Sequence, residues 1–354
     1  MPNEPRFGAQ KIRLALTGCG RISANHFASL EKFRDHVEIV AVCDSNPAAL
    51  NKAVLHTGAE GYLSHDELIE RASPDIVVLA TPSGLHASQT IAAARKGIHV
   101  LTEKPMATRW RDGLEMVKVC DEMGVRLFVV KQNRYNSTLQ LLKSAISKGR
   151  FGRIYSVSIN VFWSRPQQYY DSAKWRGTWE FDGGAFMNQA SHYVDLLDWL
   201  VGPVESVMAF TGTLARNIEV EDSGVAIIRW RNGALGTVNV SMLAYPKNFE
   251  GSITILGEKG TVRIGGVAVN EIQHWEFEDK DAEDGKLTDV SYQVPSVYGY
   301  GHIAYYRNVI NTLKGSAEAS TDGREGLRSL EILVAIYKSA TDACRTDLPL
   351  ESGL

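Results

Sequence analysis

Two polar segments of the 354-residue chain contain residues that could carry out a proton-transfer reaction. The first, Thr102-Glu103-Lys104-Pro105, follows a short apolar run. The ammonium group of Lys104 could stabilise the charge that develops on a substrate oxygen. Proline at 105 also makes a cis Lys104–Pro105 bond possible. A surface loop without a role in chemistry is the alternative for this segment.

The second segment, 185–201, follows Gly183-Gly184 and is expected to form one buried helix. Asn188, His192 and Asp195 stand at i, i+4 and i+7 and therefore on one face of such a helix. A histidine there could take a hydroxyl proton near neutral pH. Polar groups on a buried face need partners, which could be a sugar or hydroxy acid in a cleft or an internal hydrogen-bond network.

A third patch, between Trp163 and Thr178, is dense in aromatic and cationic residues. Arg165, Tyr169, Trp175 and Arg176 belong to it. Such a composition suits a sugar ring stacked on aromatic side chains, with carboxylate or phosphate groups held by arginine. A plain protein–protein interface loop is the alternative.

A glycine turn follows the first apolar run and could bind a dinucleotide. In Gly18-Cys19-Gly20-Arg21-Ile22-Ser23, the glycines permit a tight turn and let backbone amides approach a pyrophosphate at a helix N-terminus. Ser23 replaces the usual third glycine. Arg21 could meet a phosphate or be a solvated charge.

Asp44 ends the second apolar run, where a carboxylate can bond the adenine-ribose hydroxyls and would repel a 2′-phosphate. The sequence therefore favours NAD over NADP. The alternative for Asp44 is a cap or turn residue before Pro47, although Ser45 or Asn46 could do the capping. Thr81-Pro82-Ser83-Gly84-Leu85-His86 follows another strand and should face the cofactor, or else be only a good turn and helix start.

The elements that must position these residues differ between the two halves of the chain. Short buried runs alternate with amphipathic helices up to about residue 130, which predicts a doubly wound parallel sheet. The expected strands are 12–16, 38–43, 76–80, 99–101 and 127–130, and the expected helices are 48–57, 65–72, 85–97 and 109–123. Strands joined by hairpin turns follow, at 153–163, 204–213, 225–230, 235–243 and 252–256. Asn232-Gly233 marks one hairpin, and 323–341 is expected to be a C-terminal amphipathic helix.

The sequence thus predicts an α/β protein with a Rossmann domain over 1–133 and an α+β domain with a mostly antiparallel sheet over 134–354. The net charge of −3 gives no reason to expect nucleic acid or an anionic membrane as a partner. No apolar run is long enough to cross a bilayer or to serve as a signal peptide. Four scattered cysteines indicate neither a zinc site nor a disulfide framework, so we expect no metal and a cytoplasmic location.

Taken together, these motifs resemble the Gfo/Idh/MocA oxidoreductase family over almost the whole chain. The resemblance is carried by Gly18-Cys19-Gly20 with Asp44, Thr81-Pro82 with His86, Glu103-Lys104-Pro105, and Gly183-Gly184 with His192 and Asp195. It implies an NAD-dependent oxidoreductase with Lys104 and His192 as the catalytic pair. It also implies an open-faced sheet and a homo-oligomer, with a tetramer favoured. Where the family usually has aspartate, four residues before the histidine, this chain has Asn188, whose amide can orient a substrate but cannot accept a proton.

Within that family the chain resembles the nucleotide-sugar branch, through Lys131-Gln132-Asn133-Arg134-Tyr135-Asn136, the 165–178 loop and Asn188-Gln189. That resemblance implies oxidation of the C-3′ hydroxyl of a UDP-linked N-acetylhexosaminuronic acid to a ketone, in the synthesis of diacetamido-uronic acids for lipopolysaccharide or O-antigen. The expected cofactor-binding residues are Gly18, Cys19, Gly20, Arg21, Ile22, Asp44, Ser45, Thr81, Pro82, Leu85, His86, Glu103, Lys104, Gln132, Trp175 and Arg176. The expected substrate-binding residues are Lys104, Arg165, Tyr169, Asn188, Gln189 and His192.

Three other functions remain open from the sequence. The enzyme could oxidise a free sugar or an inositol, or the chain could be an NAD-binding regulator without turnover. A third possibility is that NAD is held so firmly that a separate oxidant must recycle it.

Overall fold

A computed structural model describes residues 10–292 and 301–351 and divides them into two compact units. The first contains the described residues up to Val130 together with His302–Leu327, and the second contains the rest. Residues 302–327 belong to the first unit although they come late in the chain, because part of this segment pairs with β6 (Leu127–Val129) of its sheet. The Val129 amide donates to Thr321 O at 3.0 Å, and Phe128 and Asp322 form a β-bridge. The domain boundary predicted from the sequence, between residues 133 and 134, assigned 302–327 to the second domain.

The first unit is built on a six-stranded parallel sheet of order β3-β2-β1-β4-β5-β6. This is the strand order of the dinucleotide-binding doubly wound fold, and it confirms the expected α/β architecture. Every strand that the sequence predicted in this half is present, and short β3 is added to them. The strands are β1 (Ile12–Thr17), β2 (Val37–Cys43), β3 (Glu60–Tyr62), β4 (Ile76–Leu79), β5 (His99–Thr102) and β6 (Leu127–Val129).

Helices connect these strands, and local sequence explains where they begin and end. Asn46 caps the helix that starts at Pro47 by accepting the Ala48 and Ala49 amides, as the sequence allowed. Gly58 ends it in the left-handed region at φ 70°. The helices are α1 (Ser23–Leu30), η1 (Glu31–Phe33), α2 (Pro47–Thr57), α3 (His65–Arg71), η2 (Ser83–Leu85), α4 (His86–Arg95), α5 (Trp110–Glu122) and α10 (Gly301–Leu313). α11 (Gly323–Asp342) runs from the first unit into the second.

The second unit is built on an eight-stranded sheet of order β13-β12-β11-β7-β10-β9-β8-β14. All its pairs are antiparallel except β7 with β10, which confirms the mostly antiparallel sheet. The predicted Asn232-Gly233 turn joins β9 to β10, with Gly233 at φ 89°. The strands are β7 (Ile154–Phe162), β8 (Val204–Gly212), β9 (Ser223–Trp230), β10 (Leu235–Ser241), β11 (Glu250–Gly257), β12 (Gly260–Gly265), β13 (Glu271–Phe277) and β14 (Thr346–Asp347).

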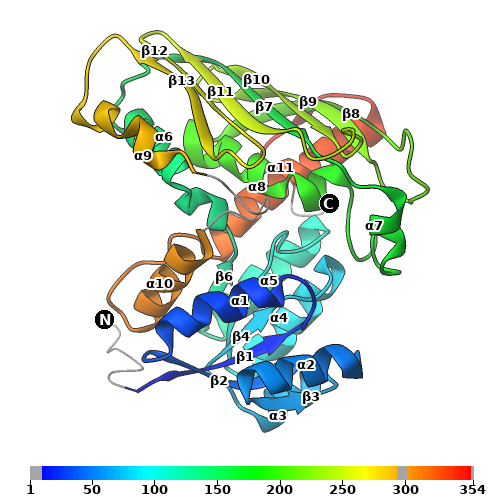
Figure 1. Ribbon diagram of the computed structural model, residues 1–354. Helices are drawn as coiled ribbons and strands as arrows, with labels where there is room; N and C mark the ends of the chain where they lie inside the picture. Colours follow the sequence, from blue (N-terminus) through cyan, green and yellow to red (C-terminus); the bar gives the residue numbers. More distant parts are fainter. Residues whose placement is uncertain (1–9, 293–300, 352–354) are drawn as a thin grey trace. The chain divides into compact units, whose positions relative to one another are not determined.

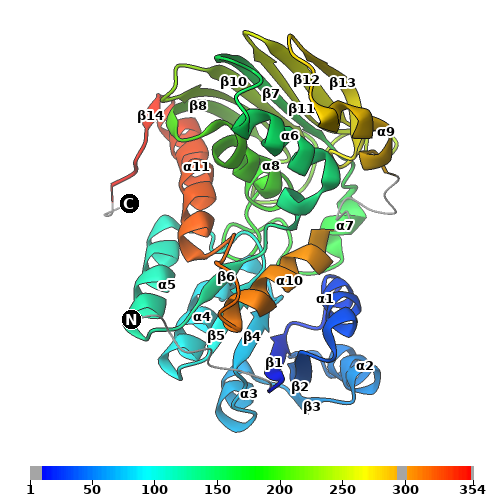
Figure 2. The ribbon, with the colours of Figure 1, turned by 90° about the vertical axis from the view of Figure 1, so that its left-hand side faces the viewer.

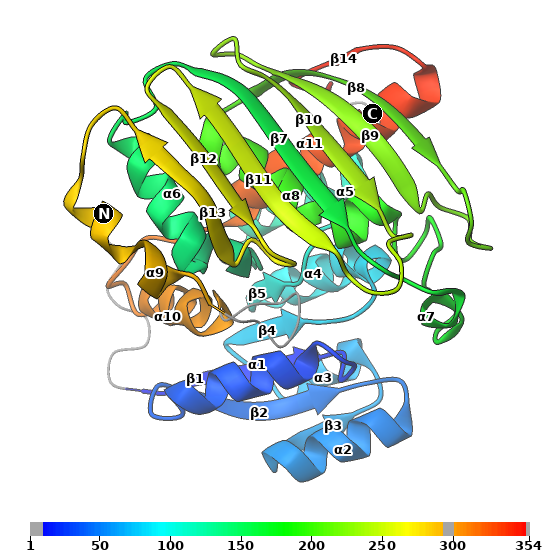
Figure 3. The same ribbon diagram turned by 45° about the horizontal axis from the view of Figure 1, so that its top comes forward.

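One face of this sheet is covered by α6 (Ser137–Ser147), α8 (Ser191–Leu196) and the second-unit part of α11, which Figures 1 and 2 show on the same side of the strands. Figure 3 shows the opposite face, on which no helix of the described residues lies. Burial along β9 alternates accordingly: Ala226, Ile228 and Trp230 are buried, while Val225 and Ile227 are exposed. The remaining short helices are η3 (Gln132–Tyr135), α7 (Gln167–Asp171), η6 (Ala282–Lys286) and α9 (Leu287–Val290).

The segment 185–201 differs from the single α-helix that the sequence predicted. It consists of a π-helical turn, η4 (Ala185–Gln189), then α8, then a second π-helical turn, η5 (Leu197–Val201). A π turn inserts an extra residue, so the α-helical rule that places i, i+4 and i+7 on one face does not hold across residues 189–190. The expectation that Asn188, His192 and Asp195 form one continuous row is therefore wrong.

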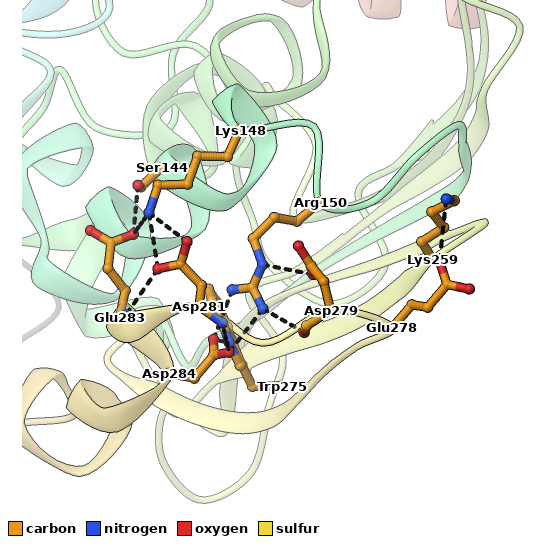
Figure 4. Close-up of polar contacts among 10 residues, drawn as sticks. All are labelled: Ser144, Lys148, Arg150, Lys259, Trp275, Glu278, Asp279, Asp281, Glu283 and Asp284. Atoms are coloured by element: carbon orange, nitrogen blue, oxygen red, sulfur yellow. Dashed lines mark hydrogen bonds and ion pairs between the residues drawn. The ribbon is translucent and has the colours of Figure 1, made fainter.

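An ion cluster fixes the chain after β13 to the end of α6 (Figure 4). The Arg150 side chain is only 3% exposed and forms a two-pronged pair with Asp284, at 2.7 and 2.9 Å, while its Nε contacts Asp279 at 3.2 Å. Lys148 contacts Asp281 and Glu283 at 2.9 and 2.8 Å. The Arg150 pair holds the pKa of Asp284 well below its usual range, against the effect of partial burial.

Candidate active site

The expected dinucleotide turn lies at the carboxyl edge of the first sheet, directly after β1. Gly18 has φ 98°, and a Cβ there would come within 2.5 Å of the Ala80 carbonyl group, so only glycine fits between β1 and β4. A Cβ on Gly20 would meet nothing within 4 Å, so the backbone there is open to approach. α1 begins without a side-chain cap, and in its first turn the amides of Ser23 and Asn25 donate to the carbonyl groups of Gly20 and Ile22. These features fit a pyrophosphate.

Asp44 lies after β2 and holds this turn. Its Oδ2 accepts the Cys19 amide at 2.8 Å and its Oδ1 accepts the Asn46 amide at 2.8 Å. Asn46 caps α2, as the sequence allowed, and Asp44 takes the other part of the alternative weighed for it, that of a turn residue before Pro47. Burial, together with the Asp44 charge, raises the pKa of Cys19 to about 12, so its thiol stays neutral beside the turn.

Thr81 and His86 lie after β4, at the same edge. His86 is buried, with Nδ1 2.9 Å from Pro105 O and Nε2 3.0 Å from Thr81 O. Burial lowers the pKa of His86, against both carbonyl contacts, which raise it. His86 therefore connects the Thr81 loop to the Lys104-Pro105 loop. Its expected role in cofactor binding stays a prediction, and the structure shows it bound to two backbone carbonyls.

Glu103 and Lys104 follow β5, again at this edge, and the Lys104–Pro105 bond is cis. Glu103 is buried; its Oε2 accepts the Lys104 amide at 3.1 Å and its Oε1 lies 3.2 Å from Nε2 of His26 on α1. His26 Nδ1 lies 2.7 Å from the Tyr306 hydroxyl of α10. Burial disfavours the Glu103 carboxylate, but the hydrogen bond and charge of His26 outweigh it and hold its pKa at about 2. A buried carboxylate thus anchors the backbone that carries Lys104.

In the second unit, His192 is held by a residue from a distant part of the sequence. Gln132 of η3 and His192 of α8 are both buried, and the Gln132 amide nitrogen lies 3.0 Å from His192 Nε2. This contact fixes the plane of the ring, and which group donates in it is set by the tautomer of His192. Gln132 was expected to bind the cofactor, which remains a prediction; its contact in the structure is with the expected base.

Asp195 lies one helical turn beyond His192 and forms an ion cluster, not a proton-transfer group. Arg134 binds both of its carboxylate oxygens at 2.7 Å, and Lys131 Nζ is 3.3 Å away. Burial opposes ionisation, but the two cations hold the pKa of Asp195 at about 2. Lys131 and Arg134 flank Gln132, so this cluster fixes the turn that places Gln132 on His192. For Asp195 the structure therefore shows an internal network of polar side chains.

Tyr169 is the centre of the aromatic and cationic loop. Its hydroxyl accepts hydrogen bonds from Arg176 Nη1 and from Gln189 Nε2, the latter at 3.1 Å. The Arg176 guanidinium lies over the Tyr169 ring at 4.3 Å and over the Trp175 ring at 4.4 Å, and the Arg165 guanidinium lies 5.4 Å from the Tyr169 ring. The structure therefore brings together four side chains that the sequence singled out, and joins Gln189 to them.

Asn188 lies near this cluster in η4. Its side-chain nitrogen donates to Asp182 Oδ1, and Asp182 Oδ2 accepts the Gly177 amide at 2.7 Å. Asp182 thereby connects the aromatic loop to the turn that carries Asn188 and Gln189. Asn248, which accepts from Arg165 Nη1 at 3.1 Å, has a similar supporting role. No sequence signal pointed to Asn248, because residues 165 and 248 meet only through the tertiary fold.

Among the described residues no group of His, Cys, Asp and Glu side chains is arranged to hold a metal ion. Within the same ranges, no helix is both long and apolar enough to span a membrane.

The chain matches two family models that together extend over both units. Residues 12–131 match the NAD-binding Rossmann-fold domain of the Gfo/Idh/MocA oxidoreductases, and residues 143–345 match the C-terminal alpha/beta domain of the same group.

Solved structures similar to the chain include two dehydrogenases. The WlbA dehydrogenase from Chromobacterium violaceum, in complex with NADH and UDP-GlcNAcA, is 63% identical, with a TM-score of 0.95 over 99% of this chain and 100% of that one. The WlbA dehydrogenase from Bordetella pertussis, with the same two ligands, is 62% identical, with a TM-score of 0.96 over 98% and 100%. Among curated proteins, the myo-inositol 2-dehydrogenase of Thermotoga maritima is 25% identical over 93% of this chain and 96% of its own length.

Proposed function

Because the chain belongs to the Gfo/Idh/MocA oxidoreductase family and has its NAD-binding Rossmann domain, we propose that it oxidises the C-3′ hydroxyl of a UDP-linked N-acetylhexosaminuronic acid to a ketone. The observation that carries the proposal is similarity at 62–63% identity to two dehydrogenases whose structures contain NADH and UDP-GlcNAcA. The arginine and tyrosine cluster around Tyr169 supports it, because guanidinium groups suit the anionic groups of a nucleotide sugar. Synthesis of bacterial surface polysaccharide is the process proposed for this reaction.

In the proposed complex the carboxyl edge of the first sheet holds NAD. The Gly18–Ile22 turn faces the pyrophosphate and offers it the amides of Gly20, Arg21 and Ile22, because those of Gly18 and Cys19 donate to Cys43 O and Asp44. Asp44 and Ser45 face the adenine ribose, and the Thr81–Leu85 turn with Glu103 faces the nicotinamide half. When bound, NAD supplies the acceptor for the hydride that leaves the substrate carbon. Gln132, Trp175 and Arg176 remain proposed cofactor contacts.

The chemistry of the chain itself is proton removal and charge stabilisation. We assign the proton at the substrate hydroxyl to His192, because a neutral imidazole is basic near pH 7. Lys104 stabilises the developing negative charge on the same oxygen. Arg165, Tyr169, Asn188 and Gln189 orient the sugar, which contributes mainly by restricting its geometry.

A free sugar or an inositol is the second candidate substrate, favoured by relatives such as the D-apiose dehydrogenase of Paraburkholderia graminis, 24% identical over 96% of this chain and 90% of its own length. Turnover of the purified protein with UDP-N-acetylglucosaminuronate, D-apiose and myo-inositol, followed at the NADH absorbance, decides between them. We expect kcat/KM for the nucleotide sugar to be at least about 100-fold higher, the value of two lost hydrogen bonds. Higher kcat/KM for either polyol would overturn the proposal.

The same assay separates an enzyme that releases its cofactor from a regulator and from an enzyme that retains it. Tight NAD binding without oxidation of any of the three compounds would support a regulator instead of an enzyme. Turnover that stops after one equivalent of bound NADH, and resumes on addition of an oxidant, would support a permanently held cofactor.

We also propose that the chain forms a homo-oligomer through the uncovered face of the eight-stranded sheet, and that it acts in the cytoplasm. On that face Phe210 lies opposite Val225 and Met208 opposite Ile227, and all four side chains are exposed. A contiguous exposed apolar surface of this kind is typical of a protein–protein interface. The cytoplasmic location is supported by the four cysteines, all of which are free.

A further inference from the structure

The turn η4, which carries Asn188 and Gln189 and leads into α8 with His192, begins without a cap of its own. Gly184 stands at its N-cap position and has no side chain to accept a hydrogen bond. The first amides of any helical turn need acceptors from outside the turn. Here the amides of Gly184, Phe186 and Met187 all point to two side chains from distant parts of the second unit.

Tyr337 of α11 and Glu221, two residues before β9, supply these acceptors. The Tyr337 hydroxyl accepts the amides of Gly184 at 3.3 Å and Met187 at 3.1 Å, and donates its own proton to Glu221 Oε1 at 2.8 Å. Glu221 Oε1 also accepts the Phe186 amide at 2.9 Å. All three amides are therefore satisfied through one phenol and one carboxyl oxygen.

Gly184 makes room for this arrangement. Its φ of −91° and ψ of −162° are open to any residue, so the backbone conformation does not require glycine. A Cβ at this position would lie 1.6 Å from Glu221 Oε2 and 2.0 Å from its Cδ. The glycine is thus required by the Glu221 carboxyl group that fills the space where a side chain would be.

Glu221 is only 3% exposed, and its Oε2 has no hydrogen-bond partner among the described residues. Burial raises its pKa to about 7, helped by the charge of Asp222 and opposed by the bonds from Phe186 and Tyr337. Tyr337 and Asp222 are the titratable groups that face it. A neutral carboxyl group still accepts at Oε1, so the cap persists in either protonation state.

We propose that Glu221 and Tyr337 are positioning residues for the reaction: they cap η4 from outside and thereby fix Asn188, Gln189 and the start of α8 with His192. This inference rests on the proposed function for the assignment of His192 as the base. Neither residue is proposed to touch the substrate. Removing the cap frees the backbone of 184–187, and a misplacement of about 1 Å in groups that orient a substrate can lower a rate about 100-fold.

The test compares Glu221→Ala, Glu221→Gln and Tyr337→Phe with a matched control, Glu331→Ala. Glu331 is a half-buried carboxyl group on α11 that accepts the Leu350 amide at 2.7 Å, away from η4, and burial raises its pKa too. We expect Glu221→Ala and Tyr337→Phe to lower kcat about 10- to 100-fold without changing the Kd for NAD. Glu221→Gln retains an acceptor oxygen and should recover most of the rate.

Gly184→Ala provides an independent arm, because the new methyl group must displace the Glu221 carboxyl group. We expect it to lower kcat as Glu221→Ala does, and to cause no further loss when combined with Glu221→Ala, since that variant has already emptied the space. Additive losses in the double variant would contradict the inference.

Hydrogen exchange of the substrate-free protein separates this inference from the proposed function. Amides 184–187 should exchange at least about tenfold faster in Glu221→Ala and Tyr337→Phe than in Glu331→Ala, because each loses an acceptor. If the wild-type protein oxidised no nucleotide sugar, the proposed function would fail, yet this exchange result would still hold. Unchanged exchange, or a kcat equal to that of Glu331→Ala, would overturn the inference.

Discussion

At the scale of single residues, His192 is distinguished by what holds it. Gln132 fixes its ring through Nε2, and the Asp195 cluster fixes the turn that carries Gln132. Such a ring is pre-oriented, so its replacement should affect the rate more than substrate binding. We expect His192→Asn to lower kcat about 100-fold or more, the usual contribution of a general base, with KM changed only a few-fold.

Steady-state kinetics with the nucleotide sugar measure this. Gln132→Met keeps the length of the side chain but loses the polar contact with the ring, and should give a smaller loss of kcat than His192→Asn. Near-normal turnover of His192→Asn would remove the base assignment.

Glu103 gives a prediction about stability. Its carboxylate is buried beside His26 and accepts the Lys104 amide, so Glu103→Gln removes a buried charge that these contacts stabilise and should lower the free energy of unfolding by about 3 kcal/mol. The folded pKa is about 2 against an ordinary 4.5, so this stabilisation is present above about pH 4.5 and is lost as the pH falls towards 2.

Urea denaturation at pH 7 and at pH 3 tests both statements. The matched control is Glu115→Gln, which removes an exposed pair with Lys118 at 3.5 Å and should cost little. If the difference in unfolding free energy between Glu103→Gln and the wild type were as large at pH 3 as at pH 7, the ionised Glu103 carboxylate would not be its source.

At the scale of elements, the sequence predicted most of those whose signal is local, but it missed the helices α6 and α10. Every expected strand and helix of the first unit is present, because buried runs and amphipathic periods are properties of short windows. β12 and β13 were missed because polar and charged residues interrupt them, as in Glu271–Phe277, and β14 has only two residues. The π turns on either side of α8 were missed because no local pattern distinguishes them from α-helix.

Contacts between residues far apart in the chain could not be predicted from the sequence. Arg165, Tyr169, Arg176 and Gln189 were singled out by type, and the structure groups them. The sequence could not predict that the Glu221 carboxyl group fills the space beside Gly184, because the two residues lie far apart in the chain and meet only through tertiary packing.

The ion cluster of Figure 4 gives a prediction for one element, the segment that follows β13. Arg150 is its buried member and pairs with Asp284 and Asp279, so Arg150→Ala leaves Asp284 without its strongest partner. We expect a loss of about 2 kcal/mol in unfolding free energy, since a charge pair at a partly exposed carboxylate is worth less than a fully buried one. Because the pair lowers the pKa of Asp284, this contribution should be lost as the pH falls below the ordinary carboxyl range.

Thermal unfolding with hydrogen exchange of residues 278–285 measures the effect. Lys259→Ala is the matched control in the same figure: its pair with Glu278 at 3.2 Å is exposed and should contribute little. Equal changes in the two variants would mean that burial of Arg150 does not strengthen the cluster.

At the scale of the whole molecule, each unit contributes a different part of the proposed reaction. The first has the glycine turn, Asp44 and the Glu103-Lys104 segment at one edge of its sheet, and the second has His192 and the Tyr169 cluster. In the second unit, helices pack on one face of the sheet, and the opposite face has no helix of the described residues on it (Figure 3). Met208, Phe210, Val225 and Ile227 are exposed on that opposite face.

That uncovered face gives the last prediction. Ile227 is 58% exposed on β9, and Phe210 is 65% exposed on β8, with Met208 and Val225 as their cross-strand neighbours. If a second copy of the chain covers these side chains, a charge placed among them would be buried without a partner and would oppose assembly by several kcal/mol. Ile227→Glu should therefore convert the oligomer to smaller species, measured as mass by light scattering during size-exclusion chromatography.

Leu55→Glu is the control, because Leu55 is 87% exposed on α2, in the other unit, and the same substitution there should leave the mass unchanged. An unchanged mass for Ile227→Glu, or a monomeric wild-type protein at micromolar concentration, would mean that another partner, or solvent alone, covers this face.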